Sequence, residues 1–89
     1  MRTMEEMVEE IKGKIRQHIV HRILLKKDER ILNMDDSLIQ AGIIDSLGIQ
    51  MLITFLEREY QIAIPEEELY PENFETINDI ANLVTRIKK

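Results

Sequence analysis

Residues 45–65 read DSLGIQMLITFLEREYQIAIP, and this stretch decides how the chain folds. Residues 46–60 contain no proline, and their apolar side chains recur at spacings of three and four, the period of one helix face. The predicted core-facing residues are Ile49, Leu52, Ile53, Leu56 and Tyr60. Asp45 stands just before the helix and is a preferred residue type for an N-cap. We therefore predict an amphipathic helix over residues 46–60.

A second apolar stripe lies on a neighbouring face of the same predicted helix. Leu47, Met51 and Phe55 follow one another at intervals of four residues. A domain of 89 residues has one modest core and cannot bury every face of one helix. We therefore expect part of this second stripe to be exposed to solvent.

Capping patterns predict one further helix on each side. Thr3-x-x-Glu6 is a capping box, and the apolar residues after it indicate a helix from about residue 4 to the low twenties. Thr76-x-x-Asp79 is a similar pattern ahead of a final helix. The two predicted stripes are Met4, Val8, Ile11, Ile15 and Ile19, and then Ile77, Ile80, Ala81, Val84 and Ile87. Residues 65–74 hold both prolines and predict brief turns or a short helix.

Residues 26–45 form a long connection in which apolar residues are isolated and regularly spaced. Such a connection is either disordered or packed by its own side chains, and regular anchors favour packing. The expected anchors are Ile31, Met34, Leu38 and Ile39. Asp35 or Asp36 is expected to cap a single turn, which Gly42 would end.

Three amphipathic helices and a short one predict an all-α fold, a small four-helix bundle with a long first loop. The chain length fits one domain over residues 1–89. Its net charge of −5 is unevenly placed, because residues 35–79 carry eleven acidic residues and Arg58 as the single basic one. This acidic middle argues against a nucleic-acid partner and favours partners with basic patches. The alternative is an acidic face that is only solvated.

The chain has no cysteine, which excludes disulfides, thiolate catalysis and cysteine-based zinc sites, and fits a reducing, cytoplasmic location. The first ten residues lack the apolar core of a signal peptide, and no aliphatic run exceeds three residues, so we expect no membrane insertion. His18 and His21 could share a helix face, but no carboxylate is clearly paired with them. We therefore expect solvated or packed histidines and no metal site. The three glutamates at residues 66–68 lack the spacing of a calcium loop.

The only two serines are Ser37 and Ser46, and each lies in an Asp-Ser-Leu triplet. Neither has the Gly-x-Ser-x-Gly surroundings of a hydrolase nucleophile. Ser46 stands where an irregular loop meets a helix, so a phosphate ester there would be stabilised by the helix dipole and by free N–H groups. The alternative is that Asp45 or Ser46 only caps the helix, and local physics alone favours the cap.

The segment GIIDSLGIQMLITFLEREYQIAIP, residues 42–65, resembles the acyl carrier protein family, which includes peptidyl and aminoacyl carrier domains. The residues that match the family pattern are Gly42, Asp45, Ser46, Leu47, Ile64 and Pro65. The match continues through ENFETINDIANLV, residues 72–84, and chain length and helix order agree as well. The resemblance therefore covers nearly the whole domain and implies a bundle of the acyl-carrier type.

The resemblance implies that Ser46 is the attachment point for 4′-phosphopantetheine, which a phosphopantetheinyl transferase moves from coenzyme A onto the hydroxyl. It implies that Asp45 helps to hold magnesium during that transfer. The terminal thiol of the arm then carries an acyl or aminoacyl group as a thioester, and the domain itself is not an enzyme. Its other partners would be acyl- or amino-acid-activating and acyl-transferring enzymes, and we expect a monomer.

The predicted partner face departs from carriers of fatty acid synthesis, which tend to be densely acidic along this helix. Here no charged residue lies between Ser46 and Glu57. We therefore favour a specialised, free-standing carrier of a lipid, polyketide or nonribosomal-type pathway over a carrier of general fatty acid biosynthesis. The alternative from another class is an unmodified helical interaction module. The expected partner contacts are Leu47, Met51 and Arg58, with Ile43 and Ile44 beside the arm.

Overall fold

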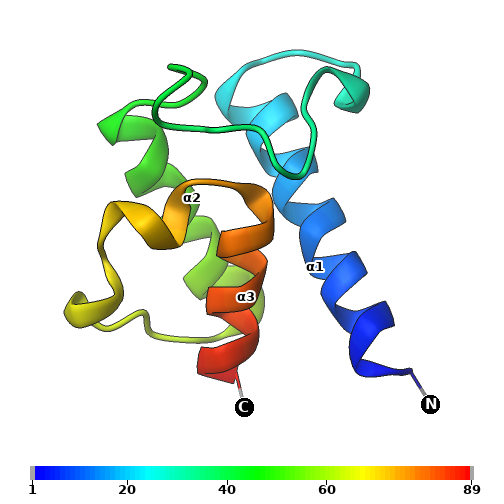
Figure 1. Cartoon of the computed structure of the whole chain (residues 1–89), viewed down its shortest axis with the longest axis vertical. Helices are drawn as coiled ribbons and strands as arrows, with labels where there is room; N and C mark the ends of the chain where they lie inside the picture. The colour runs from blue at the N-terminus through cyan, green and yellow to red at the C-terminus, as the bar shows by residue number, and fades with distance from the viewer. Residues whose placement is uncertain (1, 89) are drawn as a thin grey trace.

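The computed structural model describes residues 2–88, and every regular element in this range is helical (Figure 1). The three main helices are α1 (Met4–His18), α2 (Ser46–Tyr60) and α3 (Ile77–Lys88). The shorter segments are a π-helical turn (Ile19–Ile23) and three 3-10 turns (Glu29–Ile31, Glu66–Glu68 and Pro71–Phe74). The predicted all-α fold is confirmed, and α2 has the predicted bounds. The predicted short fourth helix is present as the last two 3-10 turns.

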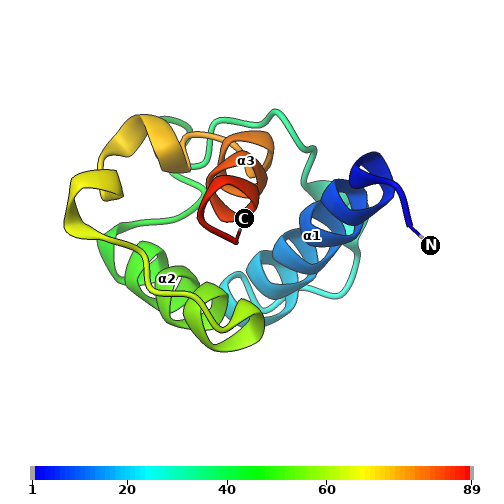
Figure 2. The same cartoon turned by 90° about the horizontal axis from the view of Figure 1, so that it is seen from below.

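The three main helices surround one apolar core, and α3 packs against both of the others (Figure 2). The buried residues of α3 are Ile77, Ile80, Ala81, Leu83 and Val84. Leu83 lies outside the predicted stripe and is nevertheless fully buried. The reason is that α3 also contacts the Pro71–Phe74 turn, so it needs a wider apolar surface than a helix that is covered on one side only.

Side-chain caps fix where each main helix begins. The Glu6 N–H donates to Thr3 Oγ1 and the Thr3 N–H donates to Glu6 Oε1, both at 3.1 Å. The Asp79 N–H donates to Thr76 Oγ1 at 3.1 Å. Both predicted capping patterns are therefore confirmed, and Asp45 is confirmed as the N-cap of α2. One such cap stabilises a helix by about 1 kcal/mol.

The last turn of the first helical segment is a π-turn, in which the Leu24 N–H donates to the Ile19 carbonyl oxygen at 2.8 Å. Ile19 and Val20 are adjacent in sequence and are both fully buried, which a wider turn accommodates better than a regular α-turn. Leu25 follows with a positive φ of 56° and turns the chain into the long connection. Helical structure into the low twenties is therefore confirmed, with a changed geometry at its end.

The connection predicted over residues 26–45 is packed against the helices, as expected, although not through all of the expected anchors. Its buried apolar residues are Leu32, Leu38 and Ile44. Met34 is partly buried, whereas Ile31 and Ile39 are exposed, so the prediction is wrong for these two. The 3-10 turn Glu29–Ile31 directs Ile31 outward and the following residue inward, which a regular spacing of anchors does not anticipate.

The turn before α2 ends at Gly42, which has a positive φ of 71°. Glycine adopts this left-handed conformation without steric cost, so it ends the turn as predicted. Asp36 does not cap this turn, contrary to the prediction. Its Oδ2 accepts a hydrogen bond from the Asn33 N–H at 2.8 Å and so closes the turn that precedes it. Asp35 is exposed and does not cap the turn in its place.

Candidate functional site

Ser46 is the first residue of α2, and it is exposed. The N-cap beside it is Asp45, whose Oδ1 accepts a hydrogen bond from the Gly48 N–H at 2.9 Å. Of the two capping residues that the sequence left open, Asp45 therefore fills the role. Among residues 2–88, no hydrogen bond engages the Ser46 hydroxyl. The hydroxyl is therefore accessible and free to react.

The surroundings of this hydroxyl fit a phosphate ester. The N–H groups of the first helical turn have no intrahelical acceptor, and the helix dipole makes this end of α2 positive. The Asp45 cap takes the Gly48 N–H and leaves the N–H groups of Ser46 and Leu47 to an anion. The cap uses Oδ1 of Asp45, so Oδ2 remains as the kind of oxygen ligand that Mg²⁺ prefers.

Ser37, in the other Asp-Ser-Leu triplet, is held inside the fold. Its hydroxyl donates a hydrogen bond to the Glu75 carboxylate, in a partly buried position. The backbone N–H of the next residue, Leu38, donates to the Glu75 carbonyl oxygen at 2.8 Å. Ser37 therefore fastens the long connection to the residues before α3 and does not present a free hydroxyl.

Gly48 sets the position of the site, and the sequence reasoning did not single it out. It is buried in the first turn of α2, where an added Cβ would lie 3.1 Å from the Ile44 Cβ and 3.4 Å from the Ile23 Cγ2. The missing side chain thus lets the π-turn and the connection pack directly on the start of α2. The sequence did contain an indication of this role. A glycine inside a predicted helix lowers helix propensity, so its presence there suggests a close packing contact.

Ile44 was expected beside the arm and in contact with partners, but it is 4% exposed and belongs to the core. Its N–H donates to the Leu38 carbonyl oxygen at 3.0 Å. A partner cannot reach this side chain in the folded protein, so Ile44 supports the site from beneath. Ile43 is partly exposed and remains on the surface near Ser46.

The outer face of α2 is only partly covered, as predicted. Leu47 is 69% exposed and Met51 is 40% exposed. The third member of the stripe, Phe55, is stacked on the His18 ring of α1, with ring centroids 4.0 Å apart and planes inclined by 11°. Arg58 is exposed one turn beyond it.

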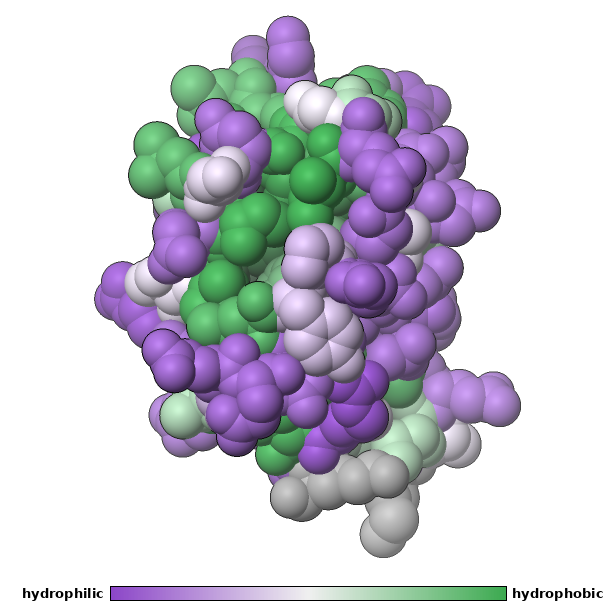
Figure 3. All heavy atoms as spheres, turned by 60° about the vertical axis from the view of Figure 1, so that its left-hand side comes forward, coloured by the Kyte–Doolittle hydropathy of each residue, from purple (hydrophilic) through white to green (hydrophobic). Residues whose placement is uncertain are grey.

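Several hollows border α2. One, of about 700 Å³, runs along α2 as far as His18 of α1 and is lined by His18, Gln50, Met51, Thr54, Phe55, Arg58 and Glu59. Another, of about 180 Å³, lies between α2 and the 3-10 turns and is lined by Ile39, Ile49, Gln50, Ile53, Leu69, Tyr70, Pro71 and Phe74. Figure 3 shows apolar side chains gathered on the side of the molecule that faces left in Figure 1. Exposed apolar surface of this kind marks places where other molecules bind.

The two histidines have separate surroundings. Burial, and secondarily the charge of Arg22, lowers the pKa of His18 below its ordinary 6.5. The Lys26 carbonyl oxygen and the Glu29 carboxylate, which lie 2.9 and 3.0 Å from the His21 ring nitrogens, raise the pKa of His21. In the described part of the chain, no group of three His, Cys, Asp or Glu side chains is placed to hold a metal ion.

The helices of residues 2–88 include none that is both long and apolar enough to cross a membrane.

The structure is a small helical bundle that exposes a serine hydroxyl at the start of α2, and comparison with known proteins identifies it as a carrier protein. The family model described as "Phosphopantetheine attachment site" matches residues 14–84, which include all of α2 and most of the chain. The chain belongs to this phosphopantetheine-binding carrier family.

Curated relatives agree with this membership. The chain is 31% identical over 78 residues to the probable acyl carrier protein PigG of Serratia sp. (strain ATCC 39006), with 88% of each chain covered. It is 36% identical over 55 residues to the D-alanyl carrier protein of Streptococcus sanguinis (strain SK36), which covers 62% of this chain and 70% of the relative. The D-alanyl carrier protein of Streptococcus suis (strain 98HAH33) is 37% identical over 54 residues, with 61% and 68% covered.

Membership of this family establishes the general function of the protein. The protein carries acyl or aminoacyl groups on a phosphopantetheine cofactor and is not itself an enzyme. It is modified by a phosphopantetheinyl transferase and interacts with the enzymes of its pathway. The resemblance to acyl carrier proteins is thereby confirmed.

Proposed function

We propose that Ser46 is the residue that bears the phosphopantetheine arm and that Asp45 holds Mg²⁺ while the arm is transferred. One observation carries this proposal: Asp45 caps α2 through the Gly48 N–H, and the adjacent Ser46 hydroxyl is exposed and has no hydrogen-bond partner among the described residues. The other serine of the chain, Ser37, is engaged with Glu75.

The transfer makes one bond and breaks one. A bond forms between Ser46 Oγ and the phosphorus that bears the pantetheine, and the pyrophosphate link of coenzyme A breaks. Adenosine 3′,5′-bisphosphate leaves, and the hydroxyl proton passes to the transferase. The positive end of α2 and its free N–H groups then stabilise the phosphodiester. The bound arm supplies the thiol for a thioester, which a chain without cysteine cannot provide itself.

The cargo belongs to a specialised acyl or aminoacyl pathway. The face of α2 that begins at Ser46 carries no charge before Glu57, and its exposed members near Ser46 are the apolar Leu47 and Met51. Such a face suits partner enzymes that bind through apolar contacts rather than through a basic patch. The D-alanyl carrier relatives, named for an amino-acid cargo, support this direction.

Arm transfer tests the site. The protein is incubated with coenzyme A, Mg²⁺ and a broad-specificity phosphopantetheinyl transferase, and its intact mass is measured. The wild type and Ser37→Ala should each gain one phosphopantetheine, whereas Ser46→Ala should gain none. An arm on Ser46→Ala would exclude Ser46 as the site, and no arm on the folded wild type would overturn the proposed function.

Loading of the arm-bearing protein tests the pathway. A panel of amino-acid-activating enzymes and acyl-activating enzymes is compared with the loading enzymes of fatty acid synthesis. We expect thioester formation with an activating enzyme to exceed loading by the fatty acid enzymes. Preferred loading by the fatty acid enzymes would instead indicate a carrier of general fatty acid biosynthesis.

A further inference from the structure

A third hollow, of about 320 Å³, concentrates positive charge in a protein whose net charge is −5. It lies mostly along α1 and the π-turn, in the basic segment of residues 11–27, which contains six Lys or Arg and no Asp or Glu. The lining residues from this segment are Lys14, Gln17, His18, His21 and Arg22. Two residues of α2 complete the lining, and Ser46 is not among them.

The acidic side chain that lines this hollow is already paired. Glu59 of α2 forms an ion pair with Lys14 at 2.6 Å. The carboxylate of Glu29 lies 3.0 Å from the His21 ring and is engaged there. Among residues 2–88, no ion pair includes Arg22, whose side chain is exposed. The charge of Arg22 is therefore available to an anion from outside the chain.

The ring of His18 is the second group in this hollow that lacks a partner. Its Nε2 is buried and has no hydrogen-bond partner among the described residues. The ring is held in place by its stack on Phe55, with centroids 4.0 Å apart. Burial, and secondarily the charge of Arg22, lowers the pKa of His18, so the ring is neutral near pH 7. A buried polar atom without a partner is unfavourable, and so is a positive charge beside an ionisable imidazole.

We propose that this hollow binds a phosphate group carried by another molecule, held by the Arg22 guanidinium with the Gln17 amide and the His18 ring as further donors. The planar guanidinium presents N–H groups in pairs that match two phosphate oxygens. The amide always has two N–H donors, and the neutral ring donates from Nε2 in the tautomer that carries its proton there. The site goes beyond arm attachment, because it shares no residue with the Ser46 site.

The bound anion would remove both unfavourable features of the empty hollow. It would offset the positive charge that Arg22 places beside His18, and it would give the buried ring nitrogen an acceptor. Such a local conflict in a folded chain is typical of a binding site, where a ligand supplies what the fold leaves unmet.

Titration with inorganic phosphate tests the site. Phosphate replaces chloride at constant ionic strength, so that general screening stays the same, while amide and side-chain resonances are followed by NMR. We expect saturable shifts at Gln17, His18 and Arg22. The pKa of His18 should rise when phosphate is bound, because a neighbouring anion favours the charged ring. Arg22→Gln should weaken phosphate binding by about tenfold.

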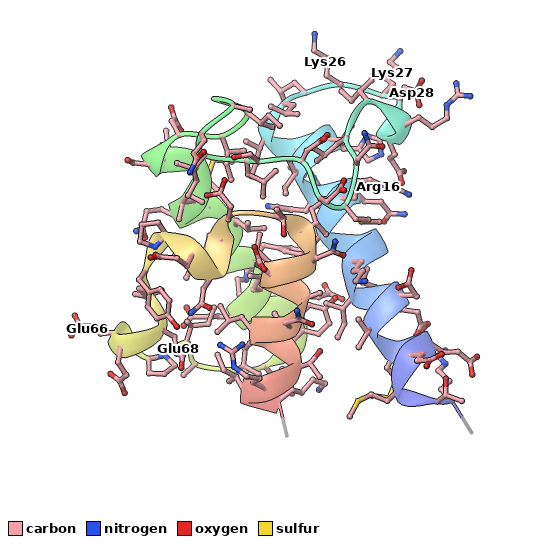
Figure 4. The ribbon with its side chains drawn as sticks, in the orientation of Figure 1. Arg16, Lys26, Lys27, Asp28, Glu66 and Glu68 are labelled. Carbon is pink, nitrogen blue, oxygen red and sulfur yellow. The ribbon has the colours of Figure 1, made fainter. Side chains whose placement is uncertain are left out.

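Lys27→Gln is the matched control, because it removes the same charge from the same basic segment without changing the lining of the hollow. Lys26 and Lys27 extend from the loop that follows the π-turn, apart from α2 (Figure 4). We expect Lys27→Gln and Ser46→Ala to bind phosphate as the wild type does. Arg22→Gln should still accept the arm, so this proposal and the proposed function can fail separately.

Vesicles distinguish a soluble phosphate from a lipid headgroup. The protein is sedimented with phosphatidylcholine vesicles that either contain or lack phosphatidic acid. Sedimentation that needs both phosphatidic acid and Arg22 would assign the phosphate to a lipid, whereas binding of inorganic phosphate without sedimentation would assign it to a soluble molecule.

Three results would overturn the proposal. Neither inorganic phosphate nor phosphatidic acid could bind, chloride could produce the same shifts as phosphate, or Arg22→Gln and Lys27→Gln could weaken binding equally. The last two results would show that the segment attracts anions only through its overall charge.

Discussion

The two Asp-Ser-Leu triplets show how three identical residue types come to serve different purposes. In residues 36–38, the aspartate closes a turn, the serine donates to Glu75 and the leucine is fully buried. In residues 45–47, the aspartate caps α2, the serine is uncommitted within the described chain, and the leucine is 69% exposed. All three side chains of the first triplet are used by the fold, whereas the second keeps only its aspartate for that purpose.

The surroundings of each triplet explain the difference. The first triplet lies in a connection without regular hydrogen bonding, so both its backbone and its side chains pair with other segments, such as Glu75. The second triplet starts a fifteen-residue helix that satisfies most of its own backbone groups. Because this segment uses only its aspartate side chain as a cap, its hydroxyl and its apolar side chain remain available to other molecules.

The largest expected difference between the two triplets is in how much each leucine contributes to stability. Leu38→Ala removes a fully buried side chain from the core and should lower the free energy of unfolding by about 2–5 kcal/mol. Leu47→Ala removes an exposed one and should change that free energy by less than about 0.5 kcal/mol. Urea denaturation followed by circular dichroism measures both. An equal loss of unfolding free energy in the two variants would contradict the burial of Leu38 and the exposure of Leu47.

Substitution of the two aspartates should affect the rate of arm transfer differently. Asparagine caps a helix nearly as well as aspartate, so Asp45→Asn should leave stability almost unchanged. It removes a proposed magnesium ligand, however, and should lower kcat/KM of arm transfer by about 10–100-fold. Asp36→Asn is the matched control and should leave the transfer rate unchanged. If both variants accept the arm at the wild-type rate, Asp45 serves only as a cap.

The two serines should differ in stability. Ser37→Ala removes a partly buried hydrogen bond to the Glu75 carboxylate and should cost roughly 1 kcal/mol of unfolding free energy. Ser46→Ala removes an exposed hydroxyl that the described fold does not use and should change stability by less than about 0.5 kcal/mol. Thermal and urea unfolding of both variants provide the comparison. A larger loss for Ser46→Ala would assign that hydroxyl to the fold.

The smallest expected effect is a pH dependence at the start of the connection that carries the first triplet. Both groups beside the His21 ring, the Lys26 carbonyl and the Glu29 carboxylate, accept hydrogen bonds, so only the protonated ring donates to both. The pKa of His21 is raised above 6.5, and the stabilisation is complete below pH 6.5 and lost as the pH rises through the raised pKa. Hydrogen-exchange protection factors of residues 24–31 should therefore fall above that pKa, while those of α2 should not.

Histidine NMR titration provides the control for this effect. His21 should titrate above 6.5, and His18, whose pKa is lowered mainly by burial, should titrate below it. His21→Ala should abolish the pH dependence of protection in residues 24–31. A pKa for His21 at or below 6.5 would contradict the role assigned to its two contacts.

The parts of the fold that the sequence predicted depend on residues three or four positions apart. The bounds of α2, the Asp45 cap and the exposed stripe through Leu47 and Met51 all follow from such spacings. The resemblance that singled out Ser46 also depends on a local motif. These features were accessible because the interactions behind them are formed within one helix or at its end.

The parts that the sequence did not predict depend on contacts between distant segments. Ser37 pairs with Glu75, which lies 38 residues away, and no local pattern indicates that pairing. Ile43 and Ile44 are adjacent and chemically alike, yet only Ile44 is buried, because Gly48 offers its side chain a place. Which side of a loop faces inward is decided by the surface against which it packs.

Gly48 has a consequence for engineering carriers by exchange of segments. The helix start that presents Ser46 rests on Ile44 in the preceding connection and on Ile23 at the end of the π-turn. A chimera that takes residues 42–60 would include Ile44 and Gly48 but not Ile23, and a host with another residue there would tilt or loosen the grafted helix. The transplantable unit is therefore discontinuous in sequence, and a successful graft must bring Ile23 with it.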